Sequence, residues 1–158
     1  MNLDRVDVQI LQILHNKGRL PVVELAKLVN LTTSPCSERV KRLEKEGYIK
    51  GYHAELNPEK LGLDVQVFIH IRLDQSSFSI FDRFAKAVVD MPEIEACYSL
   101  SGDFDTMIKV RVKDMKAYQA FMSGKLGTLP GVIQTRSEFV IEEHKTSFGI
   151  NPDLITHF

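Results

Sequence analysis

Apolar residues recur at helical spacing three times before Gly47, and each stripe follows a residue type that starts helices. Asp4 and Thr32 are capping residue types, and Pro21 fits a first helical turn because its missing N–H costs little there. The apolar positions of the three stripes are Val6, Ile10, Ile13 and Leu14, then Leu25, Leu28 and Val29, then Cys36, Val40 and Leu43. We therefore predict three short helices, with Asn30 in the turn between the last two.

From residue 65 onward the pattern changes to an alternation that is typical of strands with one buried face. Residues 65–74 alternate in this way, and residues 106–112 repeat the pattern. A helical pattern follows each of these strands, over residues 79–90 in the first case and after the capping residue Asp114 in the second. The inward positions of the first of these helices are Phe81, Phe84, Ala85 and Val88.

A tetrapeptide with proline in its second position then opens another strand in both halves of this region. Met91-Pro92-Glu93-Ile94 opens a strand through Ser101, and Leu129-Pro130-Gly131-Val132 opens one that ends at about Glu142. Two strand–helix–strand halves in series give the order βαββαβ. The sequence therefore predicts an α+β chain in which three helices precede a ferredoxin-like domain.

These patterns divide the chain into modules. Residues 1–53 form the helical module, which ends in a predicted short strand over residues 48–53. Residues 54–64 contain proline and glycine without strong periodicity and are the predicted linker. Residues 65–145 form the ferredoxin-like module, and residues 146–158 form a C-terminal tail with little periodicity.

The charge distribution supports two modules with different partners. Residues 1–53 carry nine Lys or Arg against six Asp or Glu, whereas the rest of the chain carries 11 against 15. An apolar share of 44% and a charged share of 26% are typical of globular proteins and argue against a disordered chain. No apolar run is long enough to cross a membrane, and two cysteines favour a reducing cytoplasm.

The outer face of the third helix carries the pattern of a DNA-reading surface. Short polar side chains near a helix N-terminus can approach base edges in a major groove, and cations further along can neutralise phosphates. The candidate DNA-binding residues are Thr32, Thr33, Ser34, Ser37, Glu38, Arg39, Lys41, Arg42 and Lys45. The alternative is a solvated helix face, because acidic residues interleave with the cations. The preceding helix and turn favour a helix-turn-helix that binds double-stranded DNA.

The segment Ser101-Gly102-Asp103-Phe104-Asp105 joins two predicted strands. Its simplest interpretation is a hairpin turn, because Gly and Asp are frequent turn residues. The same groups could also hold a free amino acid, with backbone N–H groups on its carboxylate and an aspartate on its ammonium group. On the residues alone the turn is the favoured interpretation.

The uncovered face of the predicted sheet mixes apolar and charged side chains: Phe68, His70, Arg72, Met107, Lys109 and Arg111. This composition favours a partner surface, most simply a second copy of the same sheet.

The five histidines lack metal-ligand spacing, and nucleophile and phosphate-binding motifs are absent, so we expect no metal, cofactor or catalytic residues. Two alternatives stay open: an architectural DNA-binding protein without an effector, and a regulatory subunit of an amino-acid enzyme.

Taken together, several ordered motifs across nearly the whole chain resemble the Lrp/AsnC family of feast/famine transcriptional regulators. The motifs are Leu3-Asp4-Arg5-Val6-Asp7, Gly18-Arg19-Leu20, Ser34-Pro35-Cys36-Ser37-Glu38-Arg39-Val40, Arg42-Leu43-Glu44, Leu56-Asn57-Pro58, Ser101-Gly102-Asp103-Phe104-Asp105 and Leu129-Pro130-Gly131-Val132. The resemblance implies a winged helix-turn-helix over the N-terminal module, with the recognition helix at residues 32–46. It also implies a RAM-type ferredoxin-like domain that dimerises through its sheet and forms octamers or similar rings.

The resemblance further implies a cytoplasmic, non-enzymatic regulator that responds to a free amino acid. The family's effector pocket lies between subunits, near the turn that matches Gly102–Asp105, and this shifts the interpretation of the turn toward function. The effector-binding residues that it implies are Ser101, Gly102, Asp103 and Asp105, with Thr135 and Ser137 on the last strand.

Overall fold

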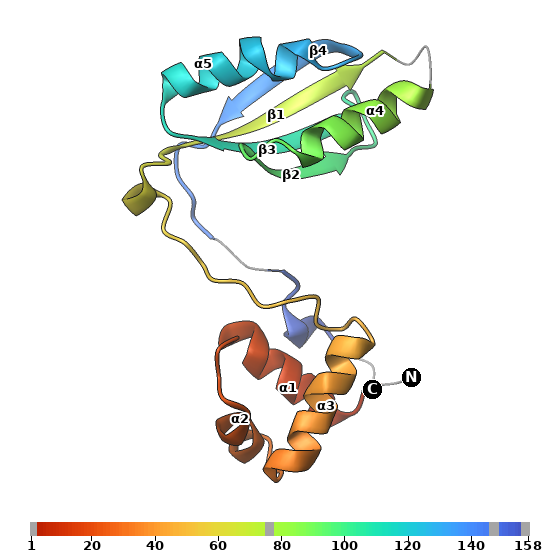
Figure 1. The fold of residues 1–158 in the computed structure, drawn as a ribbon, viewed down its shortest axis with the longest axis vertical. Helices are drawn as coiled ribbons and strands as arrows, with labels where there is room; N and C mark the ends of the chain where they lie inside the picture. Colours follow the sequence, from red (N-terminus) through yellow and green to blue (C-terminus); the bar gives the residue numbers. More distant parts are fainter. Residues whose placement is uncertain (1–2, 75–77, 146–148, 156–158) are drawn as a thin grey trace. The chain divides into compact units, whose positions relative to one another are not determined.

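The computed structural model describes residues 3–74, 78–145 and 149–155. Contacts between residues divide the chain into two compact units (Figure 1). The helical unit comprises Met1–Glu55 and His144–Phe158, and the sheet unit comprises Leu56–Glu143. The predicted tail at residues 146–158 lies outside the described residues at 146–148 and 156–158.

The helical unit contains α1 (Arg5–Asn16), α2 (Val22–Leu28) and α3 (Thr33–Lys45) (Figure 1). The predicted cap of α1 is confirmed, because the Asp4 carboxylate accepts a hydrogen bond from the Asp7 N–H at 2.8 Å. The Asp7 carboxylate accepts one from the Asp4 N–H at 3.1 Å, which completes a capping box. Asn30 has a positive φ of 54°, as a tight turn between α2 and α3 requires.

Two predicted features of α2 differ in the structure. Leu28 is 56% exposed, and Ala26 is buried beside Leu25 and Val29 instead, because the chain turns away at Asn30 directly after this short helix. Pro21 is the N-cap of α2 and does not lie within its first turn.

Thr32 occupies the predicted N-cap position of α3, but its side chain makes no capping hydrogen bond. A capping oxygen accepts from the second or third helical N–H; Pro35 at the third position has none, which leaves only the N–H of Ser34 as a donor.

The predicted strand over residues 48–53 is wrong. The segment has no regular secondary structure, because no neighbouring strand pairs with it in the described part of the chain. Instead, the N–H groups of Tyr48 and Ile49 donate to the carbonyl of Leu43 as α3 ends, and the Tyr52 hydroxyl donates to Glu44 at 2.9 Å. Burial and this hydrogen bond raise the pKa of Tyr52 to about 12, so the phenol stays neutral at physiological pH.

In its described residues the sheet unit contains four strands and two helices: β1 (Val65–Leu73), α4 (Phe78–Val89), β2 (Ile94–Ser99), β3 (Thr106–Val112), α5 (Met115–Gly124) and β4 (Val132–Phe139). The strands form one antiparallel sheet in the order β2-β3-β1-β4, and both helices cover the same face (Figure 1). The predicted ferredoxin-like order is therefore confirmed. Short 3-10 turns lie at Glu59–Leu61, Leu126–Thr128 and Pro152–Leu154.

The core of the sheet unit lies between the sheet and its helices. The predicted inward residues of β1 are essentially fully buried: Val67, Ile69, Ile71 and Leu73. In α4 the buried stripe is Ile80, Phe84 and Val88, a spacing of four residues that leaves Ala85 exposed, contrary to the prediction. β4 ends at Phe139 rather than near Glu142, because it pairs with β1 and Val67 opposite Phe139 is close to the start of that strand.

Gly131 is required where α4 approaches the start of β4. Its φ is 80°, and a Cβ built there would lie 2.1 Å from Cγ2 of Ile80, far inside van der Waals contact.

The uncovered sheet face carries the six predicted side chains, each half-buried. Within the described ranges, no helix is long and apolar enough to cross a membrane.

Candidate DNA-binding surface and effector site

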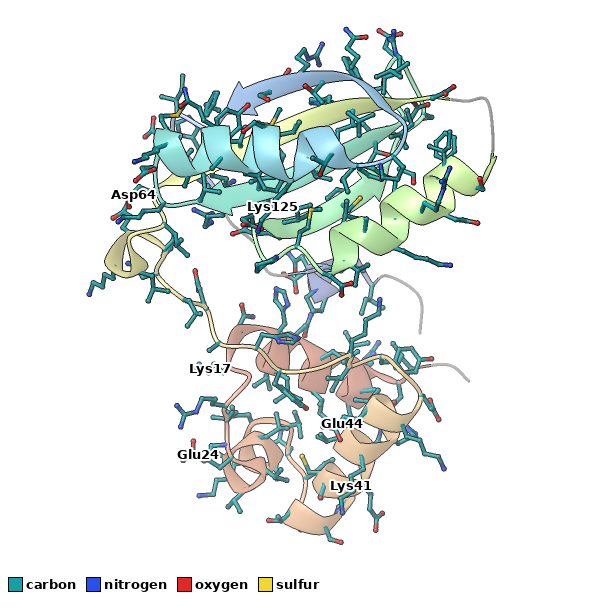
Figure 2. The ribbon with its side chains drawn as sticks, turned by 45° about the horizontal axis from the view of Figure 1, so that its top comes forward. Lys17, Glu24, Lys41, Glu44, Asp64 and Lys125 are labelled. Atoms are coloured by element: carbon teal, nitrogen blue, oxygen red, sulfur yellow. The ribbon has the colours of Figure 1, made fainter. Side chains whose placement is uncertain are left out.

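The structure exposes six of the nine predicted DNA-binding residues on α3 and its N-cap. The opposite side of the helix buries Cys36, Val40 and Leu43 in the core of the helical unit. The exposed candidates are Thr32, Thr33, Ser34, Glu38, Lys41 and Lys45, whereas Ser37, Arg39 and Arg42 are half-buried. Figure 2 shows Lys41 and Glu44 on this helix, with Glu24 on α2. Short polar groups therefore precede cations along one exposed face, which is the order that a major groove accepts.

The two arginines of α3 are bound within the chain. Arg39 Nη1 lies 2.6 Å from Asp4 Oδ2 and 2.7 Å from Asp7 Oδ1, and Arg42 Nη2 lies 2.5 Å from Asp7 Oδ2. The Asp7 side chain is only 1% exposed, whereas that of Asp4 is 51% exposed. Sequence reasoning assigned both arginines to DNA and missed these ion pairs, whose partners are more than thirty residues apart.

These ion pairs and hydrogen bonds shift the pKa values of the residues that form them. The hydrogen bond from the Asp7 N–H, together with Arg39, lowers the pKa of Asp4 below its usual value. Hydrogen bonds to Asp4 and Asp7 raise the pKa of Arg39. Burial raises the pKa of the Cys36 thiol, which therefore stays neutral in the core.

The predicted effector turn is fixed to the start and end of neighbouring strands. The Asp105 N–H donates to Ile71 O at 3.0 Å, and its carbonyl accepts from the Leu100 N–H at 2.9 Å. The Asp105 carboxylate accepts from the Leu73 N–H at 2.8 Å. Ser101, Gly102 and Asp103 are exposed, and Asp105 is half-buried. The turn is thus ordered by backbone bonds while three of its four candidate residues face solvent.

Phe104 in the same turn lies against the uncovered sheet face. Its ring centroid is 5.4 Å from Arg72 Cζ, 5.0 Å from Arg136 Cζ and 5.6 Å from the ring of His70. Arg72 also donates to the carbonyl of Asp103, from Nε at 3.0 Å and from Nη2 at 2.7 Å. Sequence reasoning missed Phe104; an aromatic residue in an otherwise polar turn was the available signal.

Thr135 and Ser137 lie on β4, opposite Ile71 and Ile69 of β1. Residues paired in an antiparallel ladder point to the same face, so both lie on the helix-covered face. The Tyr118 hydroxyl of α5 donates to Ser137 Oγ at 2.6 Å. Thr135 and Ser137 therefore lie on the opposite sheet face from Arg136, the β4 residue that contacts Phe104 of the turn. Among the described residues, no group of three or more His, Cys, Asp or Glu side chains could hold a metal ion.

Comparisons with known proteins match both units. Residues 3–50 match the winged helix-turn-helix DNA-binding family, and residues 66–150 match the Lrp/AsnC ligand binding domain. The chain is 46% identical over 146 residues to the leucine-responsive regulatory proteins of Escherichia coli K12 and Klebsiella pneumoniae, covering 92% of this chain and 89% of each relative.

Solved structures show the same similarity. A transcriptional regulator of Neisseria meningitidis in complex with L-Met superposes with a TM-score of 0.91 at 36% identity, over 94% of this chain and 96% of that one. An AsnC family regulator of Agrobacterium tumefaciens gives 0.91 at 35% identity, over 97% and 99%. A helix-turn-helix unit and a ligand-binding unit in one chain, matched along almost their whole length, identify this protein as a member of the Lrp/AsnC family of transcriptional regulators.

Proposed function

We propose that the exposed face of α3 enters the major groove of double-stranded DNA and reads its sequence. The observation that supports this most directly is the order of exposed side chains, with Thr33 and Ser34 in the first turn and Lys41 and Lys45 further along. Small hydroxyl side chains reach base edges, and lysines pair with phosphates. Residues 54–64 link this function to the sheet unit.

We propose a free amino acid as the effector, bound at Ser101, Gly102, Asp103 and Asp105. Two relatives support this chemistry, since their names mention leucine and L-Met. In the turn, a carboxylate side chain would hold the ammonium group, and exposed backbone N–H groups near Gly102 would hold the carboxylate. Thr135 and Ser137 would come from a neighbouring subunit, as the resemblance to a family with its effector pocket between subunits implies.

We also propose that the uncovered sheet face pairs with a second copy in a dimer, and that dimers form an octamer or similar ring in the cytoplasm. The half-buried Phe68 and Met107 on this face support the pairing, because such a mixed surface is stabilised by a matching partner. The protein would regulate without catalysing a reaction.

Calorimetry with each common amino acid, combined with DNA binding, tests the effector. Asp105→Asn keeps an acceptor for the Leu73 N–H and removes the charge that would hold an ammonium group. We expect it to weaken amino-acid binding about tenfold or more and to leave DNA affinity in the absence of effector unchanged. Asp90→Asn, on an exposed residue after α4, is the matched control.

Two results would contradict the proposal. If calorimetry of the wild-type chain detected no heat of binding with any of the common amino acids, the protein would be an architectural DNA-binding protein. If Asp105→Asn responded normally, Asp105 would not be an effector ligand. Turnover of an amino acid without DNA binding would instead favour the enzyme-subunit alternative.

A further inference from the structure

Asp7 is the one buried charged residue in the described part of the chain. A carboxylate removed from water is stable only when its oxygens are paired with donors. The side chain lies in the first turn of α1, a position where the capping box requires only its interaction with the Asp4 N–H. The deep burial therefore needs a further explanation.

Both oxygens of this carboxylate are bound to α3. Oδ1 lies 2.7 Å from Arg39 Nη1, and Oδ2 lies 2.5 Å from Arg42 Nη2. The two arginines are three residues apart and therefore lie on the same side of the helix. Their common carboxylate fixes α3 at two points, which restricts its rotation about its own axis relative to α1.

The arginine side chains are also partly withdrawn from solvent. Their exposed fractions are 29% for Arg39 and 37% for Arg42, and Arg42 Nε is buried with no hydrogen-bond partner among the described residues. Lys41, which lies between the two arginines in sequence, is by contrast exposed to solvent (Figure 2). Cations on α3 thus divide into those held by Asp7 and those that face solvent.

We infer that Asp7 is the positioning residue of the DNA-binding surface, holding Arg39 and Arg42 against α1 so that they orient α3 while its exposed side chains contact the duplex. This inference rests on the proposed contact between α3 and DNA. It reassigns the two arginines from DNA contacts to supports of the helix. It also accounts for a charged residue at a buried position.

The test compares specific with non-specific binding by full-length Asp7→Asn. The probes are a duplex selected from a random library by the wild-type chain and poly(dI–dC). We expect affinity for the selected duplex to fall about tenfold or more, because a misoriented α3 loses base contacts. Affinity for poly(dI–dC) does not fall, because phosphate contacts tolerate reorientation and one negative charge is removed. Glu24→Gln removes an exposed carboxylate of α2 and should leave the ratio of the two affinities unchanged.

An equal fall with both DNAs would show only a loss of folded protein and would overturn the inference. A second variant, Arg42→Met, tests the same inference if Asp7→Asn does not fold. We expect it to lower the salt dependence of binding much less than Lys41→Met, which should reduce the slope by about one. An equal reduction would place Arg42 on a phosphate and reject its supporting role. A wild-type chain that enriched no sequence would reject the DNA contact itself, and the inference with it.

Discussion

The helical and sheet units are held together by different means. In the described residues, the core cluster of the sheet unit contains twelve buried apolar side chains, whereas that of the helical unit contains seven. The helical unit adds a buried carboxylate with two arginines, Asp7 with Arg39 and Arg42. The sheet unit also has a pair of arginines, but these lie at its surface. Arg72 donates to a carbonyl of the turn, and both Arg72 and Arg136 lie over the aromatic ring of Phe104.

The difference shows where each unit tolerates change. A small core supplemented by a buried ion pair depends on charge and geometry, since removal of one partner leaves the other unpaired. A large apolar core depends on shape, and its surface arginines can move without exposing a buried charge. The helical unit is therefore sensitive to charge changes, and the sheet unit to changes in volume.

The largest expected effect concerns the surface of the sheet unit. Phe68→Glu would place charges in the proposed dimer interface, beside Glu138 on the paired strand. We expect the dimer dissociation constant to rise about a hundredfold or more, measured by sedimentation equilibrium. Val89→Glu, on an 80% exposed position of α4, is the control and should not dissociate the dimer. A stable Phe68→Glu dimer would place the interface elsewhere.

The volume sensitivity of the sheet unit is tested at Gly131. Gly131→Ala combines a positive φ with a clash against Ile80, so we expect the free energy of unfolding to fall by roughly 2–4 kcal/mol in urea titrations. Gly62 also has a positive φ, but an added methyl group there would have no neighbour within 4 Å, so Gly62→Ala should cost only about 1 kcal/mol. Equal losses would mean that Ile80 moves aside without cost.

The helical unit offers the matching backbone test at Asn30, which has a φ of 54°. Asn30→Ala should lower the free energy of unfolding by about 1 kcal/mol, because alanine disfavours the left-handed region more than asparagine does. Asn30→Gly should stay within about 0.5 kcal/mol of the wild type in the same urea titrations. A neutral alanine variant would show that the turn between α2 and α3 adopts another conformation.

The smallest expected effect is the response of the helical unit to acid. The pKa of Asp4 is lowered in the folded chain, so its stabilising contribution is present above the unfolded pKa of 3.8 and is lost as pH falls through the folded value. Asp4→Asn should therefore reduce the loss of stability between about pH 5 and pH 3, measured as a smaller shift of the urea midpoint. An unchanged shift would assign the acid response of the helical unit to carboxylates other than Asp4.

Local patterns predicted most of the fold because their causes lie within a few residues. The alternation of β1, the Asp4 cap and the left-handed Asn30 each depend on neighbours in sequence, and the structure confirms them. The strand over residues 48–53 failed because a strand needs a partner that the local pattern does not specify. The predictions that Leu28 and Ala85 are buried were wrong, because a small difference in position around a helix decides which side chain is buried.

The candidate sites were only partly accessible to sequence reasoning. The exposed polar face of α3 follows from helical periodicity, so residues such as Ser34 and Lys41 lie where the pattern placed them. The partners of Arg39 and Arg42 could not be found in this way, since Asp7 belongs to another helix. The stacking of Phe104 on Arg72 and Arg136 likewise depends on how the turn folds back over the sheet.

Phe104 has a consequence for regulation, because its backbone belongs to the turn and its ring belongs to the outer sheet face. A molecule that displaced the turn would also reshape the surface offered to another subunit. By thermodynamic reciprocity, a subunit that covered this ring would change the affinity of the turn for its ligand by the same factor. Through this one aromatic side chain, the proposed binding of an effector at the turn and the proposed pairing of the sheets would depend on each other.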